Sequence, residues 1–180
     1  MTDATLSPPF GEMLARWHEF YGLLGAAAAT MVALLFVAAS LGSGVFATGR
    51  PAGLRFFFSA TVVNFALILI ASLIALAPLD ARAAFAAMIA ITGLFGLGYY
   101  AVAWVEIGRE GILAKVDFED RAWYGVLPVI GHVVETAAGA ALIWRGEGFE
   151  ALALALGGLL IVGIHNAWDI TIWVIGKKSS

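Results

Sequence analysis

The chain has 180 residues, of which 62% are apolar and only 13% are charged. Its mean hydropathy of +0.93 excludes an ordinary soluble domain, because too few polar side chains remain to cover the surface. The net charge of −3 excludes the basic surface that nucleic-acid binding needs. The absence of cysteine excludes disulfide frameworks, thiolate catalysis, and cysteine-ligated zinc or iron–sulfur clusters.

Residues 1–20 are predicted to form an interfacial segment at a membrane surface. Ser7 precedes two prolines, and apolar side chains then follow three or four residues apart, at Phe10, Met13, Leu14 and Trp17. Such a spacing is typical of a short amphipathic helix that lies among the lipid headgroups.

Five apolar stretches come next, each longer than the roughly 20 residues that a helix needs to cross the hydrocarbon core. They cover residues 21–47, 56–77, 83–107, 123–144 and 149–175. Glycine, proline and charged residues in the breaks between them predict turns. The predicted fold is therefore an all-α integral membrane bundle of five transmembrane helices over 21–175, followed by a cytoplasmic tail, 176–180.

The distribution of basic residues predicts the orientation of this bundle. Arg16, Arg82 and Arg145 fall on one side of the five spans, and the other seven lysines and arginines fall on the opposite side. Since lysine and arginine are retained in the cytoplasm during insertion, the N-terminus is predicted to be outside and the C-terminus cytoplasmic.

Three segments resemble a group of uncharacterised bacterial integral membrane proteins. They are the small-residue run at 25–30, the apolar run at 34–40, and the sequence from Asn166 to Asp169 in the last span. The resemblance implies a multi-pass protein of the bacterial inner (plasma) membrane.

Four ionisable side chains inside the last two spans are the candidate functional residues. His132 and Glu135 are spaced i,i+3, and His165 and Asp169 are spaced i,i+4, so each pair projects from one face of its helix. An acid at a helix centre costs about 2.5–3.5 kcal/mol on insertion scales, so a compensating role is expected. Counted from the cytoplasmic ends of the spans, the polar residues lie within a layer of about 9 Å. The sequence therefore predicts one polar pocket in the cytoplasmic half of the bilayer, where the two pairs face each other. Its other predicted members are Asn64, Asn166 and Tyr100.

Such a pocket is compatible with several chemistries. His132 and His165 are candidate ligands for a divalent metal or axial ligands for haem or a pigment. Histidine and carboxylate also suit acid–base catalysis on a lipid or quinone, or the proton coupling of a transporter. A purely structural role, in which the polar groups hold helices together by hydrogen bonds, remains the alternative.

The chain's short loops leave little apparatus outside the bilayer. We therefore expect an accessory or small-ligand-binding membrane subunit rather than an enzyme. Apart from the lipid bilayer, its expected partners are further copies of itself or a larger membrane complex.

Overall fold

The computed structural model describes residues 9–41, 52–109, 111 and 117–178. The described residues are almost entirely helical, and no strand occurs among them. The elements are α1 (Phe10–Leu41), α3 (Ala52–Leu76), α4 (Arg82–Arg109), α5 (Phe118–Arg121), the π-helix η2 (Ala122–Val126), α6 (Leu127–Trp144) and α7 (Phe149–Lys178). Because α5, η2 and α6 follow one another without a break, they make one long helical run.

Five helices are long and apolar enough to cross a membrane, as the sequence predicts. They comprise Phe10–Ser40, Phe57–Leu76, Arg82–Arg109, Phe118–Trp144 and Phe149–Trp173. The fourth helix begins five residues before the predicted start at Trp123, because Phe118–Arg121, three of them charged, are already helical. The last helix continues into the predicted tail as far as Lys178, whereas 179–180 lie outside the described residues.

The first turns of α1 differ from the predicted interfacial segment. Residues 10–20 continue directly into the first span as one helix, while residues 1–8 lie outside the described part of the chain. Phe10 packs against Phe85 of α4 and Phe149 of α7, with ring centroids 5.6 and 6.0 Å apart. The Tyr21 hydroxyl donates to the Phe149 carbonyl oxygen at 3.2 Å. These contacts attach the N-terminal turns to the end of the bundle.

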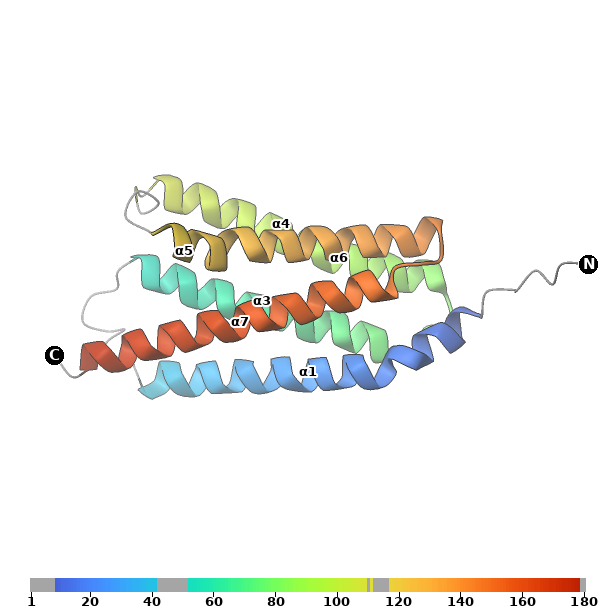
Figure 1. The fold of residues 1–180 in the computed structure, drawn as a ribbon, viewed down its shortest axis with the longest axis horizontal. Helices are drawn as coiled ribbons and strands as arrows, with labels where there is room; N and C mark the ends of the chain where they lie inside the picture. The colour runs from blue at the N-terminus through green and yellow to red at the C-terminus, as the bar shows by residue number, and fades with distance from the viewer. Residues whose placement is uncertain (1–8, 42–51, 110, 112–116, 179–180) are drawn as a thin grey trace, which may run out of the picture.

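Helices α3 and α7 lie in the middle of the bundle (Figure 1). Helix α1 covers one side of this central pair, and the tightly packed pair α4 and α6 lies on the other side. Helix α1 begins at one end of the bundle and α7 finishes at the other, as an odd number of antiparallel helices requires.

The outer faces of the helices remain apolar. Leu23 and Phe36 of α1 are 74% and 62% exposed, and Leu154 and Ile161 of α7 are 76% and 65% exposed. Large apolar side chains on the outside are the arrangement that a lipid environment favours.

Glycines bring the backbones of α4 and α6 close together. A Cβ atom at Gly139 would lie 2.8 Å from the Ala86 carbonyl oxygen and 2.7 Å from the Ala90 nitrogen. A Cβ atom at Gly96 would lie 2.5–2.6 Å from ring atoms of His132. The close approach of small residues is a common basis of helix packing in membranes, and here it seats the His132 ring against the α4 backbone.

Replacing Gly139 with alanine is therefore expected to destabilise the bundle by about 1–3 kcal/mol, since the backbone atoms of α4 must move to admit the methyl group. Gly157→Ala is the matched control, because a Cβ atom there would meet no described atom within 4 Å. Unfolding of the purified protein by sodium dodecyl sulfate measures both variants. Equal stability of the two would contradict the close approach.

Candidate functional site

A histidine–carboxylate pair lies at the centre of the bundle. The side chains of His132 and Glu135 are both 0% exposed, and His132 Nδ1 lies 2.9 Å from Glu135 Oε2. Residues three apart lie on the same face of a helix, so α6 itself brings them together. This pairing orients the imidazole and leaves Nε2 on its far edge.

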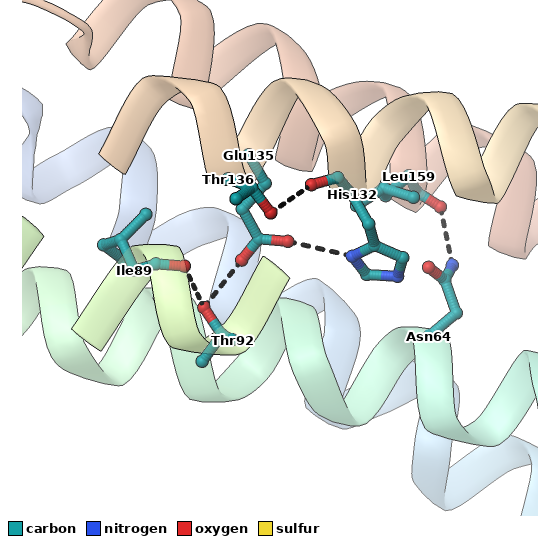
Figure 2. Close-up of polar contacts among 7 residues, drawn as sticks. All are labelled: Asn64, Ile89, Thr92, His132, Glu135, Thr136 and Leu159. Carbon is teal, nitrogen blue, oxygen red and sulfur yellow. Dashed lines mark hydrogen bonds and ion pairs between the residues drawn. The ribbon is translucent and has the colours of Figure 1, made fainter. Parts of the chain in front are cut away.

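Thr92 of α4 extends this pair into a chain of three side chains (Figure 2). Its hydroxyl oxygen lies 2.8 Å from Glu135 Oε1 and 2.7 Å from the Ile89 carbonyl oxygen. A hydroxyl has one hydrogen to donate. When Thr92 donates it to Ile89, the Thr92 oxygen accepts from a protonated Glu135; when it donates to Glu135, the carboxylate can be ionised. The hydrogen bond between Glu135 and Thr92 can therefore form with its proton on either residue.

Asn64 of α3 lies on the other side of the imidazole. Its Nδ2 atom donates to the Leu159 carbonyl oxygen of α7 at 2.9 Å. Figure 2 shows the amide oxygen of Asn64 turned toward the ring edge that carries His132 Nε2. Both atoms are buried, and neither has a hydrogen-bond partner among the residues that the structure describes. We call His132 Nε2 and Asn64 Oδ1 the two open atoms.

Tyr100 of α4 closes a further side of the site. Its ring centroid lies 5.8 Å from that of His132, and its hydroxyl lies 3.5 Å from the Ala60 carbonyl oxygen of α3. The predicted residues that come together at the centre are therefore His132, Glu135, Asn64 and Tyr100, from α3, α4 and α6.

The other predicted residues lie nearer the C-terminal end of the bundle. His165 stacks on Trp123 of η2 with ring centroids 3.8 Å apart and planes inclined by 21°. Asn166 Nδ2 donates to the Trp123 carbonyl oxygen at 3.2 Å, and the Tyr124 hydroxyl donates to the Asn166 carbonyl oxygen at 3.0 Å. Asp169 is exposed. These contacts attach α7 to the π-helix and form a group separate from the central site.

The antiparallel register of α6 and α7 is the reason for this separation. Gly131 lies directly against Leu159, His132 is one residue farther along α6, and His165 is six residues farther along α7 in the opposite direction. At 1.5 Å per residue, the two histidines are offset by about 10 Å along the bundle. The structure therefore does not bring the two predicted pairs together in one pocket.

The observed helix bounds also change the position of His132 along its helix. The fourth helix starts at Phe118 instead of Trp123, which adds five residues, or about 8 Å, to the distance of His132 from that helix end. His132 and Asn64 consequently lie near the middle of their helices, not in the half nearest the C-terminus.

The side chains in the described part of the chain do not favour a metal centre. Within it, no three histidine, aspartate or glutamate side chains gather so that they could hold an ion. A flat cofactor fits poorly as well: His132 is 0% exposed and Asn64 is 1% exposed, so a macrocycle would reach Nε2 only by separating α3, α4 and α6.

In comparisons with known proteins, no family model, curated protein or solved structure matches this chain. The central site must therefore be interpreted from its own geometry.

Sequence reasoning missed Thr92, Trp123 and Tyr124. A single threonine in an apolar span gives little signal, because threonine often bonds to its own helix backbone. The π-helix that places Trp123 beside His165 has no signature in the sequence, although π-bulges are frequent at functional sites.

The hydrogen bond between Thr92 and Glu135 generates a direct prediction. Thr92→Val keeps the side-chain shape but leaves Glu135 Oε1 buried without its partner, so we expect a loss of about 1–3 kcal/mol in unfolding free energy. Thr61→Val is the matched control: Thr61 is also buried, and the bond shown for its hydroxyl is to its own helix, at Phe57. Detergent unfolding compares the two variants. Similar losses at both positions would show that the contact with Glu135 contributes little.

Proposed function

We propose that the protein is a multi-pass subunit of the bacterial inner membrane that binds a small ligand at the centre of its helical bundle. The five apolar helices and the apolar outer faces support a membrane environment. The excess of basic residues on one side supports an outside N-terminus and a cytoplasmic C-terminus.

The two open atoms are the observation that carries the ligand-binding proposal. Buried polar atoms in folded proteins are nearly always hydrogen-bonded, and leaving one without a partner costs about 1–3 kcal/mol. His132 Nε2 and Asn64 Oδ1 belong to different helices and face the same place. A ligand located between them would satisfy both.

The enclosure of the site limits the size of this ligand. Gly96 lies against the imidazole, Tyr100 packs beside it, and Leu159 holds Asn64 from α7. A group of a few atoms is favoured over haem, a flat pigment or a metal ion.

An intramembrane enzyme is the second candidate, and one contact favours it. A carboxylate that accepts a hydrogen bond from histidine Nδ1 fixes the ring so that Nε2 faces the reacting group, as in many acid–base catalysts. Glu135 holds His132 in this way. The reaction would then take place at the same open atoms.

The orientation can be tested with single cysteines, because the chain contains none of its own. Glu147 and Asp117 are both exposed, and they lie at opposite ends of the fourth helix. Glu147→Cys in spheroplasts is expected to react with a membrane-impermeant maleimide, whereas Asp117→Cys is expected to react only after the membrane is permeabilised. Labelling of both from the same side would overturn the five-span topology.

The ligand itself can be sought by extraction. Purified wild-type protein is expected to release a small compound at near one molecule per chain, detected by mass spectrometry, and Asn64→Leu is expected to lose it. Leucine keeps the branched shape of asparagine but removes the amide. Asn166→Leu is the matched control, since Asn166 is also buried and also carries an amide oxygen without a partner in the described chain. A yield that is unchanged by Asn64→Leu would contradict binding at this site.

A further inference from the structure

The orientation of the Asn64 amide is fixed by its neighbour on α7. The Leu159 carbonyl oxygen can only accept a hydrogen bond, so the atom 2.9 Å from it must be the Asn64 nitrogen. A flipped amide would place two acceptor oxygens against each other. Asn64 Oδ1 therefore faces the His132 ring, and this oxygen can only accept.

The imidazole is more adaptable than the amide. If Nδ1–H donates to Glu135 and the ring is neutral, Nε2 carries a lone pair and accepts. If Glu135 is protonated and donates to Nδ1, or if the ring carries both protons, Nε2–H donates. The site thus offers one fixed acceptor, Asn64 Oδ1, and one atom that accepts or donates according to where the proton lies.

We infer that the group held between His132 Nε2 and Asn64 Oδ1 is a hydroxyl, either that of a water molecule or that of an organic alcohol or phenol. Its O–H donates to Asn64, and its oxygen accepts from Nε2–H; water, with a second hydrogen, also suits the other tautomer. Where the occupant is an organic compound, this inference rests on the proposed function and names the chemical class of its ligand.

The need for a hydrogen-bond donor to Asn64 Oδ1 disfavours other chemical groups between the two open atoms. A ketone, ether or quinone carbonyl has no hydrogen for Asn64 Oδ1, so two acceptors would be forced together. An aliphatic amine is protonated in neutral water, with an ordinary pKa of about 10.4, and would bring a further charge into the apolar centre. A hydroxyl satisfies both open atoms without adding charge.

The inference can be tested by solid-state NMR on the full chain in lipid bilayers. The protein has three histidines, and the double variant His18→Gln/His165→Gln leaves His132 as the single ¹⁵N-labelled ring. We expect a through-space correlation between Nε2 and a hydroxyl proton. Correlation with the water resonance identifies water, and correlation with a hydroxyl whose neighbouring C–H protons belong to the extracted compound identifies an alcohol or phenol.

Asn64→Leu in the same background is expected to lose this correlation, and Asn166→Leu is expected to keep it. Asn64→Ala repeats the measurement should the leucine variant fail to fold. No hydroxyl neighbour at Nε2, a correlation that survives in both Asn64 variants, or a neighbouring amine proton would each overturn the inference.

The proposed function and this inference fail in different ways. If no compound is extracted but Nε2 contacts water, the ligand-binding function fails while the hydroxyl site stands. If a compound copurifies but Nε2 has no hydroxyl neighbour, the hydroxyl site fails and the compound binds elsewhere.

Discussion

The hydrogen bond between His132 Nδ1 and Glu135 Oε2 is the interaction on which the centre of the bundle depends. Polar groups in an apolar interior must be paired, because water is not there to replace a lost partner. Glu135 has a second oxygen, which requires Thr92 from α4, and the imidazole needs space, which Gly96 provides on the same helix. The tight pairing of α4 and α6 is thus as much a consequence of this polar pair as of the apolar residues around it.

The contacts that His165 and Asn166 of α7 make with η2 differ from those at the centre, because they hold two helices together. The stacking of Trp123 on His165, and the hydrogen bonds between Asn166 and its neighbours, attach one end of α7 to the π-helix. One buried atom of this group, Asn166 Oδ1, has no partner among the residues that the structure describes. At the centre, by contrast, two such atoms on different helices, His132 Nε2 and Asn64 Oδ1, face the same place. This contrast separates groups that hold helices together from groups with capacity to hold something else.

The helices and their number were predictable because twenty-residue apolar runs have few other structures available to them. The pairing of His132 with Glu135 on one face was predictable as well, because it depends only on the helical repeat. The relation of His165 to His132 was not. It depends on the register of α6 against α7, shown by the packing of Gly131 against Leu159. The sequence prediction instead counted both histidines from the span ends, and the fourth helix begins at Phe118, ahead of the charged residues Glu119, Asp120 and Arg121. An error of five residues at a helix end is small in sequence, yet it changes the predicted level of a side chain by about 8 Å, enough to assign it to a different site.

Asn64 and His132 face each other from two helices, α3 and α6, that pack mainly against other helices. Asn64 belongs to α3, which packs with α1, α4 and α7, whereas His132 belongs to α6, which packs with α4 and α7. Helices α3 and α6 are not close packing partners in the part of the chain that the structure describes. A hydroxyl held by both open atoms would therefore connect two helices that otherwise meet mainly through α4 and α7.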